Sequence, residues 1–411
     1  MNIDLDFDVL IVGCGMVGAS MALALRHSPH TAKLRIAIAD RQAFDCNSTA
    51  FASTSELFDA RVSALTLSSQ QLLVQLGAWQ QAQQMRVCPY QDMAVWDGEG
   101  NGSIHFSAAK IGQEQLGTIV ENSVVQTTLI EQLNRDESIR QLIPFNIDSL
   151  EIEDNQCLRL TSVDGQQCRT RLLIGADGAN SRIRELMAFP TREWDYQHTA
   201  LVTTVRTEQA HNYTARQRFM ASGPLAFLPL NDGKGGDQHH CSIVWSCVPE
   251  RAEQLMSLSD EAFRLVLGHN FEHRLGQIEW CDKRFTLPLR QRHVTSYFRN
   301  NVVLIGDAAH TIHPLAGQGV NLGLLDVKVL AGELAMGIAC GRAVSDPRLL
   351  SRYQRKRRGH NLGMMWLMEG FKHLFAAQPL PLQWLRNTGL NAVNNVDLVK
   401  HQLARHAIGL D

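Results

Sequence analysis

The chain has 411 residues, of which 45% are hydrophobic and 19% charged, so it can bury the cores of two or three domains and is not globally disordered. Its net charge of −2 excludes a globally basic nucleic-acid-binding protein. Nine cysteines at irregular positions, without a C-x-x-C pair, argue against a disulfide framework and a zinc site, so we expect reduced thiols and no metal. The acidic start is unlike a signal peptide, and no apolar run reaches the roughly 18 residues that span a bilayer. We therefore expect a cytoplasmic protein.

Residues 8–40 have the pattern of a βαβ unit. An apolar run at 9–12 predicts a buried strand, G-x-G-x-x-G follows at 13–18, residues 19–26 predict a helix, and a second strand ends at Asp40. Glycines between a strand and a helix let a pyrophosphate approach backbone amides, and an acidic residue about 20 positions further on can bind a ribose. The unit therefore predicts a dinucleotide site, although the motif alone does not choose between NAD and FAD.

Three segments further along the chain place polar residues at predicted element boundaries. Arg61, in the run D-A-R-V-S-A-L, is predicted to enter a helix, where it could reach a phosphate or a flavin edge or simply be solvated. Asn122 is predicted to cap a helix over residues 124–133. Residues 172–184 predict a strand, an acidic glycine turn containing Asp177, and a helix.

Residues 199–296 predict a second domain built on a mostly antiparallel sheet. Strands are expected at 200–207, 217–220, 224–230 and 241–248, with a Gly-rich hairpin at 231–236. One face of this sheet can line a pocket. The candidates for its wall are Phe219, Phe227, Leu228 and Pro229, although core packing is the preferred interpretation for each one taken singly.

Residues 302–326 predict a strand, the acidic turn G-D-A-A-H, a Gly-rich loop and a helix. Gly317, Gly319 and Gly323 leave the backbone amides of the loop and first helical turn open to a flat ligand. A helix N-terminus carries roughly half a positive charge, which favours an electron-rich group there.

The C-terminal part is basic: residues 351–411 contain nine Lys and Arg but three Asp and Glu. A helix is predicted with a basic cluster at 352–358 and an apolar face at 364–375. Two interpretations stay open, a helix packed on the core with a solvated basic side, or a surface that contacts anionic lipid and admits an apolar substrate.

Together these motifs resemble the class A FAD-dependent aromatic hydroxylases, the group of para-hydroxybenzoate hydroxylase, and within it the ubiquinone-biosynthesis hydroxylases. The likeness is carried by the segments 13–18, 59–65, 175–181, 218–230 and 306–321. It implies an α/β fold with a Rossmann-like FAD-binding domain, an antiparallel substrate-binding sheet and a C-terminal helical segment. The expected ranges are 1–75, 100–190 and 297–345 for the first, 76–99 and 191–296 for the second, and 346–411 for the third.

The resemblance also implies a site. The FAD-binding residues would be Gly13, Gly15, Met16, Val17, Gly18, Asp40, Arg41, Arg61, Asn122, Asp177, Asp307, Gly317, Gly319, Val320 and Asn321, with His313 and Pro314 as candidates at the reacting flavin face. Asp40 stands where the family commonly has Glu. No residue stands out as a general base.

The implied reaction is hydroxylation of a polyprenylated phenol by O2 through a flavin hydroperoxide. NADPH or NADH would be a transient reductant, because there is one G-x-G-x-x-G unit and no second dinucleotide domain. Two alternatives remain: an FAD-dependent reductase of a prenyl lipid, and a non-catalytic flavin-bound subunit of a quinone-biosynthesis complex. Peripheral contact with the inner membrane would use residues 352–375, and no nucleic-acid partner is expected.

Overall fold

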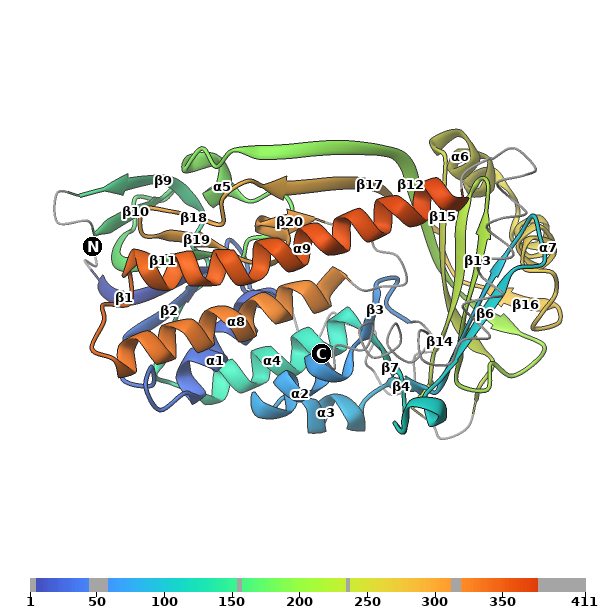
Figure 1. Ribbon diagram of the computed structural model, residues 1–411, viewed down its shortest axis with the longest axis horizontal. Coiled ribbons are helices and arrows are strands. Elements are labelled where there is room, and N and C mark those ends of the chain that lie inside the picture. The colour runs from blue at the N-terminus through green and yellow to red at the C-terminus, as the bar shows by residue number, and fades with distance from the viewer. Residues whose placement is uncertain (1–4, 44–57, 154–156, 234–236, 312–318, 376–411) are drawn as a thin grey trace.

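The computed structural model describes residues 5–43, 58–153, 157–233, 237–311 and 319–375. Two large sheets occupy opposite ends of the elongated molecule, and two long strands along one side connect them (Figure 1). Helices α1, α4, α8 and α9 lie against the first sheet. This arrangement confirms the predicted fold class.

The first sheet is a dinucleotide-binding sheet with the strand order β18-β19-β11-β1-β2-β8. Its five central strands, from β19 to β8, are parallel, and an antiparallel pair extends β11. The strands are β1 (Leu5–Val12), β2 (Ile36–Ala39), β8 (Ile139–Leu142), β9 (Ile147–Ile152), β10 (Leu158–Ser162), β11 (Gln167–Gly175), β18 (Phe298–Arg299) and β19 (Val302–Leu304).

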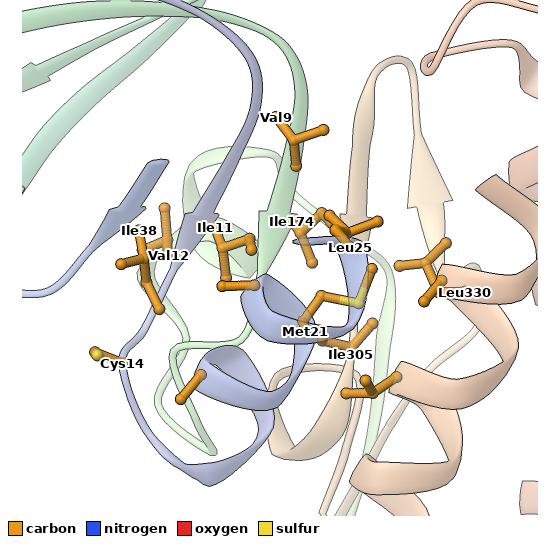
Figure 2. Close-up of a cluster of buried hydrophobic side chains, with 14 of the residues drawn as sticks. Val9, Ile11, Val12, Cys14, Met21, Leu25, Ile38, Ile174, Ile305 and Leu330 are labelled. Atoms are coloured by element: carbon orange, nitrogen blue, oxygen red, sulfur yellow. The ribbon is translucent and has the colours of Figure 1, made fainter. Parts of the chain in front are cut away.

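The core of this half follows from the apolar strands, which are buried on both faces as parallel strands covered by helices must be. Figure 2 shows Ile11 and Ile174 of the sheet near Met21 of the first helix, in a buried cluster that also contains Val9 and Ile38. Each fully buried aliphatic side chain of this kind contributes about 1.5–3 kcal/mol. The helices of this half are α1 (Met16–His27), α2 (Leu67–Gln75), α3 (Trp79–Gln84), α4 (Asn122–Arg135), α5 (Arg182–Leu186), α8 (Gly319–Ala339) and α9 (Pro347–Phe375).

The second sheet has nine strands, with the order β20-β17-β12-β15-β14-β13-β5-β6 and with β16 paired to β12. One face is covered by α6 (Pro249–Ser257) and α7 (Asp260–Asn270). Its strands are β5 (Asp92–Asp97), β6 (Ser103–Ser107), β12 (Thr191–Thr207), β13 (Thr214–Met220), β14 (Gly223–Pro229), β15 (His240–Cys247), β16 (Ile278–Cys281), β17 (Phe285–Val294) and β20 (His310–Thr311).

A small third sheet lies between the two. It consists of β3 (Val62–Leu65), β7 (Gly117–Glu121) and β4 (Val87–Tyr90), and its apolar side chains pack against the other face of the large antiparallel sheet. Two short 3-10 turns complete the fold, η1 (Ala109–Ile111) and η2 (Gly306–Ala308).

Several local expectations need correction. Arg61 precedes strand β3 and not a helix, because the helical pattern starts only at Leu67. Helix α4 is capped at Glu121, so Asn122 is its first residue. The domain ranges remain a proposal, and two segments argue for shifting them: β6 pairs with β5 in the antiparallel sheet, while α3 packs in the core of the first half.

Candidate functional site

The glycine loop after β1 is shaped by two close backbone approaches. Gly13 has φ +103°, and a Cβ on it would lie 2.4 Å from the carbonyl oxygen of Ala176. A Cβ on Gly18 would lie 1.8 Å from the carbonyl oxygen of Gly13. Side chains at these two positions would therefore force the loop apart. Gly15 differs, because a Cβ there would have no heavy atom of the described residues within 4 Å, which leaves open space beside the loop.

The N-terminus of α1 has the features of an anion-binding site. Gly15 at its N-cap supplies no side-chain acceptor, and the first turn of the helix contains no acidic residue. The N–H groups of that turn and the positive end of the helix dipole are thus left for a ligand such as a pyrophosphate. These features fit a dinucleotide.

Asp40 lies at the end of β2 and faces the same loop. Its Oδ2 accepts a hydrogen bond from the N–H of Cys14 at 2.6 Å, and its Oδ1 accepts one from the N–H of Gln42 at 3.3 Å. Burial, with a smaller effect from Asp40, raises the pKa of the Cys14 thiol to about 12, so this cysteine is not a thiolate. Arg41 is exposed next to Asp40.

Arg61 and Asn122 are brought together by the backbone. The N–H of Asn122 donates to the carbonyl oxygen of Arg61 at 3.0 Å, and the Oγ of Ser63 donates to Oδ1 of Asn122 at 2.6 Å. The Arg61 side chain is exposed, and the backbone N–H of Arg61 donates to Oδ1 of Asp59 at 2.9 Å. The loop thus holds the Arg61 backbone firmly, and the exposed guanidinium has no hydrogen-bond or ion-pair partner among the described residues.

Sequence reasoning missed the buried Glu121, which anchors this loop. Its Oε1 accepts from the N–H of Asp59 at 2.6 Å, and Nε of Arg86 lies 3.1 Å from its other oxygen. Burial raises the pKa of Glu121 to about 7, although Arg86 acts to lower it. A carboxylate directly before a polar helix start was the available signal.

The turn after β11 places Asp177 beside the glycine loop. Its Oδ2 accepts from the N–H of Ile183 at 3.1 Å, and desolvation raises the pKa of the carboxyl. The other oxygen, Oδ1, is buried without a hydrogen-bond partner among the described residues, as expected of an acceptor that meets a ligand. The buried Arg184 donates to the carbonyl oxygens of Ala179 at 2.8 Å and Ala308 at 3.1 Å, and so ties this turn to η2.

The turn at η2 contains Asp307, whose side chain is exposed to solvent. Desolvation by the surrounding protein nevertheless raises the pKa of its carboxyl. The carboxyl of Asp307 is therefore accessible to solvent although protein atoms surround it, which is compatible with contact to a bound ligand.

Helix α8 begins directly after the Gly-rich loop. Its first turn contains Gly319, Val320 and Asn321 and no acidic residue. The Asn321 side chain is buried, donates to the carbonyl oxygen of Ala64 at 2.8 Å and accepts from the N–H of Thr66 at 3.0 Å, which fixes the helix start against β3.

Gly323 does not open the helix to a ligand as expected. A Cβ there would lie 2.6 Å from Cγ2 of Val17 and 3.3 Å from Cα of Gly306, so this glycine lets α8 approach α1 and η2. The predicted residues His313, Pro314 and Gly317 lie outside the described residues.

The expected pocket wall divides between the two faces of β14. Leu228 packs toward the small central sheet, whereas Phe227 points the other way and stacks on Phe271 with ring centroids 3.5 Å apart. Because side chains alternate along a strand, Pro229 shares the Phe227 face. Phe227 therefore packs in the core and Pro229 is buried on the same face, in line with the core-packing interpretation of these two candidates. Phe219 lies on the Leu228 face, since it follows the same alternation across the β13–β14 pairing.

A different apolar group lies on that face of the sheet, on β12, β15 and β17. Its members are Ala200, Val202, Val244 and Leu289, with Ala60 from the loop that carries Arg61. They connect the Arg61 loop with the antiparallel sheet, where an apolar substrate could meet the cofactor.

The fold brings the glycine loop at the start of α1 together with the turns at Asp177 and Asp307, an arrangement that suits a dinucleotide. A model of the FAD binding domain family matches residues 59–365. The ubiquinone biosynthesis monooxygenase COQ6 of Xenopus tropicalis is 33% identical, covering 98% of this chain and 93% of that protein. The 3-demethoxyubiquinol 3-hydroxylase of Escherichia coli (strain K12) is 34% identical, covering 98% of each chain.

Among solved structures, p-nitrophenol 4-monooxygenase PnpA from Pseudomonas putida DLL-E4 has a TM-score of 0.75 at 17% identity, covering 99% of each chain, and so shares the fold. The chain belongs to the family of FAD-dependent monooxygenases of ubiquinone biosynthesis. It is a flavoprotein monooxygenase with FAD as cofactor, which confirms the family and cofactor that the motifs predicted.

The C-terminal helix α9 packs along α8 (Figure 1). Arg357, predicted to belong to a solvated basic cluster, is buried and paired with Asp326 of α8. Arg352 and Lys356 reach the buried Glu333 of the same helix, and Arg355 and Arg358 remain exposed. Within the described part of the chain, no helix is both long and apolar enough to cross a bilayer.

Proposed function

We propose that this chain hydroxylates the aromatic ring of a polyprenylated phenol in ubiquinone biosynthesis, with O2 as co-substrate and NADPH or NADH as transient reductant. The observation that carries the proposal is the alignment of nearly the whole chain with relatives named for ubiquinone biosynthesis and for ubiquinol hydroxylation. The aligned 98% of this chain includes the antiparallel sheet as well as the dinucleotide-binding half.

FAD, when bound, supplies the two-electron transfer and the activation of oxygen. The chain's own residues would bind and orient it. The amides at the start of α1 would hold the pyrophosphate, Asp40 the adenosine ribose, and Asp307 the ribityl chain or pyrophosphate region. The first turn of α8, at Gly319–Asn321, would face the pyrimidine edge of the flavin, where its positive helix end stabilises negative charge.

The apolar group on the second sheet would hold the phenol ring and keep water out. Ala200, Val202 and Leu289 are buried there beside the loop of Arg61. Exclusion of water from such a site prevents activated oxygen from being lost before it reaches the ring.

The test is turnover in ¹⁸O2 with FAD, NADPH or NADH and a short-chain prenylphenol, followed by mass spectrometry of the products. We expect one ¹⁸O atom in the aromatic ring. Oxidation of the nicotinamide with peroxide as the only oxygen product would contradict the proposal and favour a non-catalytic subunit. Loss of a prenyl double bond without O2 would favour a reductase.

We further propose peripheral contact with the inner membrane, or with a quinone-biosynthesis complex on it, through the exposed side of α9. The exposed Arg355 and Arg358 support this, since each basic residue near an anionic surface contributes about 1 kcal/mol. Replacing both by Glu should abolish co-sedimentation with vesicles containing anionic lipid and leave turnover of a short-chain phenol unchanged. Equal co-sedimentation of variant and parent protein would rule this contact out.

A further inference from the structure

A charged pair is buried where α8 and α9 meet. Nε of Arg357 donates to Oδ1 of Asp326 at 2.6 Å, and the two residues are 2% and 0% exposed. Such a pair is retained in a core only where its geometry and further hydrogen bonds compensate for lost hydration. The other hydrogen bonds of these two side chains therefore indicate the structural role of the pair.

The second oxygen of Asp326 holds the turn that contains Asp307. Oδ2 accepts from the N–H of Gly306 at 2.9 Å, and Nε2 of His310 lies 2.6 Å from it. One carboxylate thus fixes residues on both sides of Asp307. Burial acts to raise the pKa of Asp326, but His310 and Arg357 outweigh it and leave that pKa below its ordinary value, so the group is ionised.

Arg357 in turn connects the pair with the rest of the core. It donates to the carbonyl oxygen of Leu322 at 3.2 Å and to Oδ1 of Asn361 at 2.7 Å. Asn361 donates to the Tyr297 hydroxyl at 2.8 Å, and the hydroxyl of Tyr353, also on α9, donates to the carbonyl oxygen of Leu304 at 3.0 Å. Helix α9 is therefore bonded to α8 and to the end of β19, directly before η2.

The backbone at η2 needs this support. Gly306 has φ +60°, and a Cβ on it would lie 3.1 Å from Cγ1 of Val17 of α1, so a small displacement of the turn would reach the glycine-loop helix as well. If Arg357 were removed, Asp326 would keep His310 and the N–H of Gly306 but would lose the guanidinium that binds its other oxygen. A buried carboxylate that loses such a partner is destabilised, and its hold on Gly306 and His310 weakens.

We propose that Asp326 and Arg357 are positioning residues that couple the docking of α9 to the binding of FAD. They act through Gly306 and Asp307, since neither side chain lies at the site itself. Coupling of this kind is reciprocal: a docked α9 strengthens FAD binding, and bound FAD strengthens the docking of α9 to the same extent. This inference depends on FAD as the cofactor and not on the identity of the phenol.

The first experiment measures the dissociation constant of FAD in the full-length protein by flavin fluorescence. Arg357→Gln and Asp326→Asn should each weaken binding by about tenfold or more, within the usual range of coupling between sites. Arg357→Lys should restore part of the loss. The control is Arg348→Gln, which makes the same exchange at an exposed position of α9 and should bind FAD like the parent protein.

The double variant Asp326→Asn/Arg357→Gln separates coupling from general damage. If the two residues act as one unit, the FAD dissociation constant of the double variant rises by clearly less than the product of the two single-variant increases. Fully multiplicative losses, or FAD binding by folded Arg357→Gln equal to that of the parent, would overturn the proposal.

A second experiment needs no variant and so remains decisive if the substitutions prevent folding. Amide hydrogen exchange of residues 347–361 is followed in the parent protein with and without FAD. The proposal requires slower exchange in α9 when FAD is bound, with surface helix α6 unchanged as an internal reference. Identical exchange of α9 in both states would refute the coupling.

Discussion

The glycine loop at 13–18 and the flavin turn at 306–310 lie against each other but are held in place in different ways. The loop is shaped by backbone contacts within one βαβ unit: Gly18 packs on Gly13, and Asp40 binds the N–H of Cys14. The turn is held by side chains that approach from separate elements, Asp326 of α8 and Arg184 of α5. The loop should therefore tolerate no side chain at its contact glycines, while the turn should depend on charge.

The largest effect is expected at Gly18. Its Cβ would lie 1.8 Å from the carbonyl oxygen of Gly13, and a backbone group cannot move aside as a flexible side chain can. Gly18→Ala should lower the free energy of unfolding by at least about 4 kcal/mol, as measured by urea denaturation without added FAD. A loss below about 1 kcal/mol would mean that the loop is more adaptable than its packing indicates.

The next effect contrasts two ion pairs between α8 and α9. Asp326 and Arg357 are both buried, whereas Lys356, which pairs with Glu333, has a side chain that is 60% exposed. Arg357→Gln should cost about 3–5 kcal/mol because it removes the guanidinium partner of a buried carboxylate. Lys356→Gln should cost less than about 1 kcal/mol, because the ammonium of Lys356 is exposed to water and Arg352 still lies 3.9 Å from Glu333. Similar losses in urea denaturation would show that burial of the cation does not distinguish the two pairs.

A third prediction concerns the pH dependence of stability at His293, which pairs in the sheet with His310 of the turn at 306–310. Burial lowers the pKa of His293, which contacts the Tyr297 hydroxyl, from 6.5 to about 4. Between these values the unfolded chain binds a proton at this position and the native protein does not, so stability falls as the pH is lowered. The full shift corresponds to about 3 kcal/mol.

The measurement compares the parent protein with His293→Asn by urea denaturation at pH values from 4 to 7.5. Other titrating groups contribute to both proteins, so the difference between them isolates His293. It should vary with pH chiefly below about 6.5. A difference that stays constant across this range would show that His293 is not held neutral in the native protein.

The same contrast explains what the sequence could reveal. The glycine loop was predicted because its information is local: an apolar run, spaced glycines and Asp40 occur within one short segment. The ion pair of Asp326 and Arg357, which fixes the turn at 306–310, was not predicted because Arg357 lies 31 residues after Asp326. Nothing nearby in the sequence indicates that the two residues meet. Arg357 lies within a run of basic residues, and such a run does not distinguish a buried arginine from an exposed one.

The expected pocket wall on β14 shows a second limit of prediction from the sequence. Alternation along β14 indicates that Phe227 and Leu228 face opposite sides, but both sides of this strand are apolar and buried. Which side meets the cofactor depends on α6 and α7, which cover the Phe227 face. Composition of the strand alone therefore could not place the pocket.

The smallest effect on stability, and the sharpest test of the loop, is expected at Gly15. A Cβ there has no described neighbour within 4 Å, so Gly15→Ala should change the free energy of unfolding without FAD by less than about 1 kcal/mol. The same methyl group would occupy space beside the amides of α1, and FAD binding should weaken by at least about tenfold. Gly18→Ala shows the opposite behaviour, because its main effect is on the free energy of unfolding and not on FAD binding. If Gly15→Ala bound FAD as tightly as the parent protein, the open space at this glycine would not belong to the cofactor, and the pyrophosphate would have to be placed elsewhere in the loop.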